Sequence, residues 1–209
     1  MGTDHDYRAP EMNLAAGSVN RGLSPIYLAL LLLVAGPPTF AQDGRELTEE
    51  ARKQYTTGLR EASALVKDRQ YVGAQAKLDI LLAERPREPQ ARFLKGVVET
   101  EQGATDAAIA VFRALIEDYP ELPEPYNNLA VLQAQKGEYE SARSSLEIAI
   151  RTAPDWSVAR ENLGDLYARL AAVEYAQAVK LDRDNKTAPA KLVFVRDLLA
   201  KNVPAKPKS

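Results

Sequence analysis

The sequence predicts an all-α protein, built as a solenoid of stacked helix pairs. Two observations carry this prediction: a repeat of 34 residues, and helical spacing of the apolar positions within each repeat. Small residues recur at one position of each copy and prolines at another. Both series keep the 34-residue interval; they are Ala62, Gly96, Ala130 and Gly164, and Pro86, Pro120 and Pro154. Such a period indicates an array of repeated supersecondary units rather than one globular core.

Each copy is predicted to form two helices joined by a short turn. Three columns in the second half of each copy are spaced i, i+4 and i+7, as one face of a helix requires. Asp68-Arg69, Gln102-Gly103 and Lys136-Gly137 stand between the two apolar runs and predict the turn. The proline column ends the second helix, because proline cannot extend it. The columns in register are Tyr71, Thr105 and Tyr139; Ala74, Ala108 and Ala142; Leu78, Phe112 and Leu146; and Leu81, Leu115 and Ala149.

The column of small residues is expected where paired helices approach closely. A larger side chain at Gly164 should then overpack the fourth copy. The larger residues of the other columns are expected to fill the space between neighbouring pairs. Each of them contributes about 1.5 to 3 kcal/mol if fully buried.

This pattern resembles the tetratricopeptide repeat, a 34-residue helix-turn-helix unit that stacks into a right-handed α-solenoid. The copies are expected at 55–88, 89–122, 123–156 and, shortened, 157–186. In the first copy Glu61 stands at the position of Leu129, and Arg69 replaces the turn glycine, so this copy matches less well. The resemblance implies protein or peptide binding. The third copy matches best, with Tyr126, Leu129, Ala130, Gly137, Tyr139, Ala142, Leu146, Ala149 and Pro154.

The fourth copy departs from the repeat, because no glycine, proline or asparagine lies between Gly164 and Leu181. Tyr167, Ala171, Tyr175 and Ala178 form one uninterrupted helical stripe. A single long helix is therefore predicted, with a sharp turn near Ala171-Ala172 as the alternative.

The chain beyond the fourth copy predicts one more helix, at 187–203. Thr187 is expected to be its N-cap, and Pro189 lies in its first turn. This helix is expected to be the solubilising cap that such arrays need. The tail at 204–209 is expected to be disordered.

The N-terminal region has the order of a secretory signal peptide. Arg21 precedes the apolar run Ile26–Ala35, which Gly36-Pro37-Pro38 and a small-residue site ending at Ala41 follow. The run is short for about 30 Å of hydrocarbon. We therefore expect 1–41 to be removed after Ala41, with Met12 as an alternative initiator and 42–54 leading into the first helix. The expected location is the periplasm; the alternative is an inner-membrane anchor facing the periplasm.

Composition limits the chemistry of this chain. It has no cysteine, and its one histidine, His5, precedes the expected cleavage site. The mature chain would thus lack Cys and His nucleophiles and the commonest metal ligands, so no cofactor, metal or catalytic residue is expected. A net charge of -2 gives no electrostatic basis for binding nucleic acid. Glu99, Glu101 and Asp165 leave a carboxylate-dependent hydrolase of envelope polymers as an alternative from a different class.

The resemblance places a ligand in a concave groove, lined by the first helix of each pair. Asn128 and Asn162 stand one period apart there. Similar asparagines in the family bind the backbone of an extended peptide, whereas the alternative is that they stabilise the array itself. Phe93, with Val97 and Val131, is expected to form an apolar floor. The predicted groove residues are Phe93, Val97, Asn127, Asn128, Val131, Asn162 and Asp165.

Together these features predict an exported scaffold that binds a peptide segment or a helix of an envelope protein, with no stable membrane anchor after cleavage. The alternative within binding is a self-assembling array, a homo-oligomer in which the groove accepts the terminal helix of another copy.

Overall fold

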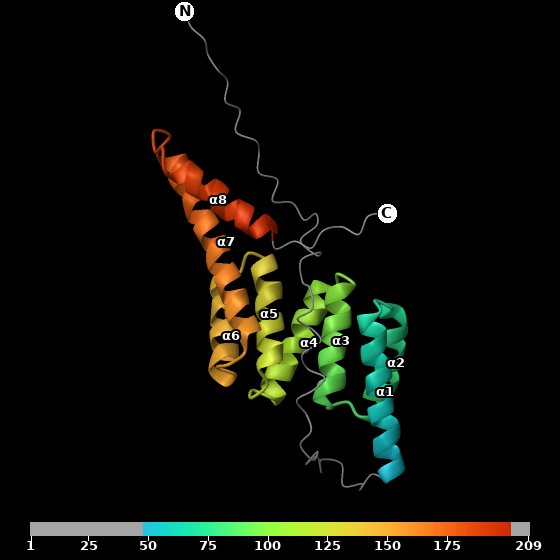
Figure 1. The fold of residues 1–209 in the computed structure, drawn as a ribbon. Helices are drawn as coiled ribbons and strands as arrows, with labels where there is room; N and C mark the ends of the chain where they lie inside the picture. The colour runs from blue at the N-terminus through green and yellow to red at the C-terminus, as the bar shows by residue number, and fades with distance from the viewer. Residues whose placement is uncertain (1–47, 202–209) are drawn as a thin grey trace, which may run out of the picture.

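A computed structural model describes residues 48–201; the leader, the lead-in up to residue 47 and the tail lie outside this range, and the first helix begins at Glu49, inside the expected lead-in. The described chain is a row of antiparallel helices without strands, so the predicted all-α solenoid is confirmed (Figure 1). No helix in this range is long and apolar enough to cross a membrane. The helices are α1 (Glu49–Lys67), α2 (Tyr71–Glu84), α3 (Pro89–Glu101), α4 (Thr105–Asp118), α5 (Pro123–Gln135), α6 (Tyr139–Thr152), α7 (Ser157–Leu181) and α8 (Ala188–Lys201).

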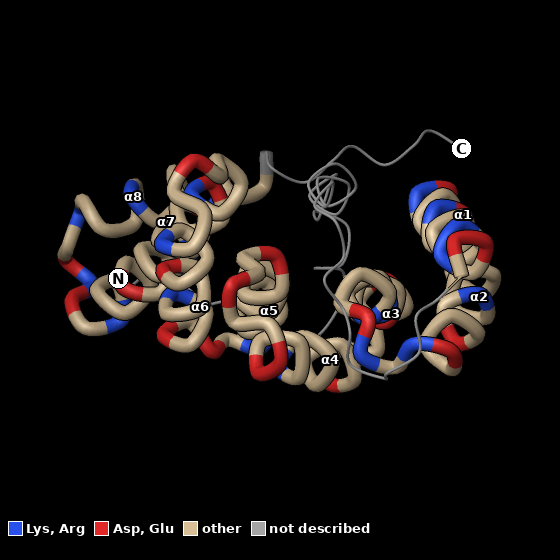
Figure 2. The backbone as a smooth tube through the Cα atoms, turned by 90° about the horizontal axis from the view of Figure 1, so that it is seen from below, with Lys and Arg blue, Asp and Glu red and all other residues tan. Residues whose placement is uncertain are grey.

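The helix pairs follow one another along a curved row. Figure 2 shows α1, α3, α5 and α7 on the inner side of the curve, with α2, α4 and α6 on the outer side. The second helices begin at Tyr71, Thr105 and Tyr139, which keeps the 34-residue period. The inner side is therefore built from the first helices, as the resemblance implies.

The turns inside the three complete pairs share one hydrogen-bonded geometry. Arg69, Gly103 and Gly137 have φ angles of 58°, 80° and 78°, in the left-handed region. The next residue donates its amide back into the preceding helix: the N–H groups of Gln70, Ala104 and Glu138 bond carbonyls of Leu65, Glu99 and Gln133 at 2.8, 2.8 and 2.9 Å. This is the Schellman arrangement, for which glycine is the favoured residue. Arg69 therefore adopts a conformation that costs an L-residue about 1–2 kcal/mol.

Replacing Arg69 by glycine is expected to raise the free energy of unfolding by about 1 kcal/mol, because it removes this backbone strain. Denaturant unfolding followed by circular dichroism measures the change. The matched control is Gly103→Ala, which introduces the same strain in the second pair and should lower stability by a similar amount. A loss of stability in Arg69→Gly would contradict the prediction.

The core lies between α3, α4 and their neighbours. Phe112 of α4 is fully buried, and its ring packs against that of Phe93 with 5.7 Å between the centroids. A Cβ atom built on Gly96 would lie 2.7 Å from the Phe112 ring, which is closer than real contacts allow. The predicted close approach at the small column is thus confirmed at Gly96.

Gly164 does not follow its column. It is exposed, and a Cβ atom there would meet nothing within 4 Å, so the expectation that it cannot be enlarged is wrong. The cause is that α7 is one uninterrupted helix of 25 residues, which also rules out the turn near Ala171-Ala172. At about 1.5 Å per residue, α8 returns along only about 21 Å of α7, so it ends before it reaches Gly164.

The last helix begins one residue after Thr187, as predicted. Asn185 supplies the cap, because its Oδ1 accepts from the backbone N–H groups of Thr187 and Ala188 at 3.1 and 3.0 Å. Leu192, Val195 and Leu199 are half-buried, whereas Val193, Phe194 and Leu198 are exposed. α8 thus packs on α7 at the end of the array, as expected for a cap, but its outer side exposes apolar side chains, because they occupy more of the helix than one neighbour can cover.

Candidate peptide-binding face

Two of the predicted groove residues belong to the core. Phe93 and Val97 of α3 are 3% and 1% exposed, and they pack with Phe112, Leu129 and Leu132. They cannot form the floor of a ligand groove, which corrects that expectation. The cause is that α4 and α5 close over this side of α3. Val131 of α5 remains half-buried on its helix.

The predicted asparagines form hydrogen bonds to each other or to the backbone of their own helix. The Nδ2 group of Asn162 on α7 donates to Oδ1 of Asn127 on α5 at 2.7 Å. Nδ2 of Asn128 donates to the carbonyl of Glu124, four residues earlier in the same helix, at 2.9 Å. The alternative of an array-stabilising role therefore describes the observed contact of Asn162, which ties α7 to α5. Asp165 is half-buried on α7, one turn beyond Asn162.

Two polar atoms of α5 have no hydrogen-bond partner. They are Nδ2 of Asn127 and Oε2 of Glu124, and both are buried. Buried polar groups are nearly always paired, and leaving one unpaired costs about 1–3 kcal/mol. The two residues are three apart on one helix, so they lie on the same face. One atom is a donor and the other an acceptor, the complement of the carbonyl and amide of a polypeptide backbone. Both are closed to solvent in the free array, and Asn127 is fully buried, so a ligand reaches them only when neighbouring side chains move aside.

Glu124 lies on the first helix of the third pair, on the side that the resemblance assigns to the ligand, but no separate role was predicted for its carboxyl group. It shares a 34-residue column with Gln90 and Val158, whose residue types differ, so the repeat gives no signal of its burial. Burial raises the pKa of the Glu124 carboxyl, and a hydrogen bond from its own backbone opposes this only in part. Without a ligand, the free energy of unfolding of the array therefore falls as the pH rises from 4.5 through the raised pKa of the Glu124 carboxyl. A bound donor at Oε2 would offset that loss.

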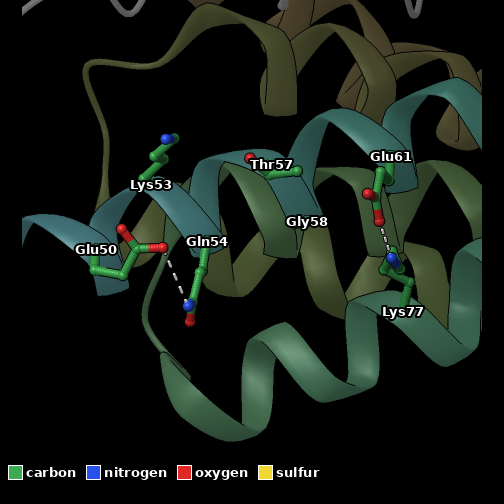
Figure 3. A pocket seen from close by; sticks show the side chains of 7 residues that line it. All are labelled: Glu50, Lys53, Gln54, Thr57, Gly58, Glu61 and Lys77. Atoms are coloured by element: carbon green, nitrogen blue, oxygen red, sulfur yellow. Dashed lines mark hydrogen bonds and ion pairs between the residues drawn. The ribbon is translucent and has the colours of Figure 1, made fainter.

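A separate hollow of about 290 Å³ opens between α1 and α2 (Figure 3). Figure 3 shows that its polar groups are largely paired across its surface: Glu61 with Lys77, and Gln54 with Glu50. Because these groups are exposed and already satisfied, the hollow is a polar end of the array rather than a binding site. Its lining residues are Glu50, Lys53, Gln54, Thr57, Gly58, Glu61 and Lys77.

The carboxylates considered for a hydrolase do not converge. Glu101 accepts a hydrogen bond of 2.8 Å from the Tyr71 hydroxyl. Glu99 lies near Lys95 and Asp79, on the side of α3 toward α2, whereas Asp165 is on α7. Within residues 48–201, no group of three or more His, Cys, Asp or Glu side chains could hold a metal ion. The arrangement gives no support to hydrolytic chemistry.

A curved row of helix pairs, with the first helix of each pair on the inner side, is the architecture of a repeat solenoid. Models of the tetratricopeptide repeat match residues 59–123 and 99–170, which together are more than half of the chain. The chain belongs to the tetratricopeptide repeat family. Repeats of this family imply a scaffold for protein–protein interaction, and their fold is typically non-catalytic.

A curated protein is similar to less than half of the chain. The human protein O-mannosyl-transferase TMTC1 is 31% identical over 93 residues, which are 43% of this chain and 10% of that protein. The chain thus spans about a tenth of the length of that relative.

Solved structures share the fold. TTC0263, a thermophilic TPR protein of Thermus thermophilus, gives a TM-score of 0.53 at 20% identity and covers 71% of this chain and 86% of its own. MamA of Desulfovibrio magneticus gives 0.50 at 20% identity, with 75% and 81% covered. The complex of Naa15 and Naa10 bound to HypK gives 0.50 at 16% identity, with 74% and 26% covered.

Proposed function

We propose that this protein is an exported scaffold that holds an extended segment of an envelope protein against the inner side of α5 and α7. The observation that carries the proposal is the unpaired donor and acceptor of Asn127 and Glu124. A free binding face keeps such groups unpaired at a cost in stability, which a ligand offsets by completing their hydrogen bonds.

In this arrangement a backbone carbonyl of the ligand accepts from Asn127 Nδ2, and a neighbouring ligand amide donates to Glu124 Oε2. Asn162 is a positioning residue, because its hydrogen bond to Asn127 Oδ1 fixes which end of that amide remains for the ligand. Val131 supplies apolar contact beside them, and Asp165 lies toward the rim. One helix pair and part of a second give a small contact area, so the expected affinity is micromolar, about -8 kcal/mol.

The proposed location outside the cytoplasm rests on the sequence from Arg21 to Ala41, where a short apolar run precedes a small-residue cleavage site. Protein recovered from a periplasmic fraction should have the intact mass of a chain that begins at Gln42. Recovery in the membrane pellet with Ile26–Ala35 still attached would favour the anchored alternative.

Replacing Asn127 by leucine is expected to weaken the retained envelope partner about tenfold, because the ligand loses its donor and the neighbouring contacts shift. The stability of the free protein should change little, because the loss of the unpaired Nδ2 donor is offset by the loss of the hydrogen bond from Asn162 to Oδ1. Retention from envelope extract is measured by quantitative mass spectrometry, and stability by thermal unfolding.

The matched control is Asn128→Ala on the same helix. Its amide nitrogen is used within α5, so retention should fall much less. Equal retention by folded Asn127→Leu and the parent chain would place the ligand elsewhere. A clear loss of stability in Asn127→Leu would instead show that the amide serves the array alone.

A further inference from the structure

The two ends of the array differ in surface character. The first end has charged and polar side chains around the hollow of Figure 3, and α2 exposes two apolar side chains there, Val72 and Ile80. At the other end, α7 continues past α5 and α6, and within residues 48–201 its partner there is α8 (Figure 1). We call the part of α7 from Ala171 on, together with α8, the terminal hairpin. Its exposed large apolar side chains are Val173, Leu181, Val193, Phe194 and Leu198.

The exposed apolar residues of α8 are distinct from those that contact α7. Phe194 is 71% exposed and Leu198 is 45% exposed, and their i, i+4 spacing puts both on one side of the helix. Leu192, Val195 and Leu199 are half-buried on the side toward α7. α8 thus has a second apolar side, and the described residues leave this side more exposed than the side toward α7.

We propose that this side of α8 is a two-fold interface, on which a second copy of the chain docks its own α8. Phe194 is the central anchor, because large aromatic side chains contribute most when an interface buries them. In an antiparallel pair related by a two-fold axis, Phe194 of one copy meets Leu198 of the other, so the apolar side is covered by itself.

A head-to-tail contact fits less well. It would place the apolar side of α8 against the first end of the array, where the exposed apolar Val72 and Ile80 of α2 are accompanied by the charged Lys53, Glu61 and Lys77. An apolar surface that covers charged groups removes their water and offers no hydrogen bond in its place, which costs free energy. The pairing of like ends avoids that cost.

A lipid surface is also a poor match. Interfacial helices that bind membranes carry an excess of lysine and arginine on their polar side. The terminal hairpin and the loop inside it have an excess of only two positive charges; the residues are Lys180, Arg183, Lys186, Lys191, Arg196 and Lys201 against Glu174, Asp182, Asp184 and Asp197. Such a surface has little attraction for anionic lipids.

The size of the hairpin sets the expected strength of the dimer. A helix of 14 residues is about 21 Å long and about 10 Å wide, so one side of α8 offers about 200 Å². With a similar contribution from α7, two copies bury about 800 Å², less than the roughly 1,200–2,000 Å² of stable complexes. The dimer should therefore be weak, with a dissociation constant of tens of micromolar.

Sedimentation velocity of the full chain between about 5 and 500 µM should show a concentration-dependent monomer–dimer equilibrium. Phe194→Glu should raise the dissociation constant more than tenfold, because a charge would be buried at the centre of the interface. The matched control is Val72→Glu, which makes the same change at an exposed apolar residue of α2 and should leave the equilibrium unchanged. Circular dichroism checks that both variants fold.

Several outcomes would overturn the proposal. One is that the full chain is a monomer throughout the concentration range. Another is that Val72→Glu loses as much dimer as Phe194→Glu does. A third is that the full chain dimerises but a chain beginning at Gln42 does not, which would assign the surface to the leader segment. Flotation of the protein with vesicles of anionic phospholipid, lost in Phe194→Glu, would assign it to a membrane instead.

The absence of cysteine from the chain allows a second measurement, independent of any destabilised variant. Chains with Phe194→Cys and chains with Leu198→Cys are mixed under mild oxidation. The antiparallel pairing predicts that the mixed disulfide forms faster than either symmetric one. A preference for the symmetric products, or no disulfide above the level of a Val72→Cys control, would contradict the pairing.

Discussion

Replacing Phe112 by alanine is expected to lower the free energy of unfolding by about 3–5 kcal/mol. The ring is fully buried, packs against Phe93, and fills the space that Gly96 leaves beside it. Its removal leaves a cavity between α3, α4 and α5, because the helix backbones cannot collapse around the missing ring. Denaturant unfolding by circular dichroism measures the loss.

The matched control for this change is Phe194→Ala, which removes the same ring from an exposed position of α8. At micromolar concentration it should change stability by less than about 0.5 kcal/mol. Since each pair of a solenoid is stabilised by its neighbours, damage at α4 should also separate the unfolding of the two ends. Equal effects of the two alanine variants would mean that Phe112 is not the centre of the core.

Gly96 and Gly164 occupy the same column of the repeat but should respond in opposite ways to leucine. Gly96→Leu is expected to destabilise the protein by about 1–3 kcal/mol, because even its Cβ atom would overlap the Phe112 ring. Gly164→Leu should be neutral or stabilising by up to about 1 kcal/mol, since the site is open and leucine favours a helix more than glycine does. Thermal and denaturant unfolding measure both.

A double variant tests the contact directly. If the Phe112 ring is the obstacle, Gly96→Leu should cost less in a Phe112→Ala background, where its side chain can enter the cavity, and the two changes should not be additive. Additive losses would show that the two positions do not touch.

The repeated columns of the sequence were enough to predict the helix pairs and their turns. A position with a required backbone conformation or a tight packing contact accepts few residue types, so the same type recurs there in each repeat. Gly103 in the left-handed turn and Ala108 against the neighbouring helix are examples. The long α7 was also predicted, because no helix-breaking residue interrupts it. These are local properties that one chain segment expresses by itself.

The candidate binding face was predicted only in part. The sequence placed Asn127, Asn128 and Asn162 on the first helices, but their hydrogen bonds depend on how α5 and α7 approach each other. Phe93 and Val97 have the same spacing whether they face a ligand or a neighbouring helix, so periodicity cannot separate the two environments. The role of Glu124 was hidden for the same reason, because a carboxylate on a helix is usually solvated.

The amino-acid sequence alone determined the repeat, the pairing of the helices, the turns and the kind of protein, because these follow from backbone preferences and apolar spacing within about 34 residues. The tertiary structure alone decided which members of a column touch a neighbour. Gly96 meets Phe112, whereas Gly164 meets nothing, and α8 leaves Phe194 uncovered. The physical reason is that burial depends on where the next helix begins and how far it reaches, which is set by the packing of whole helices rather than by the residues of either one.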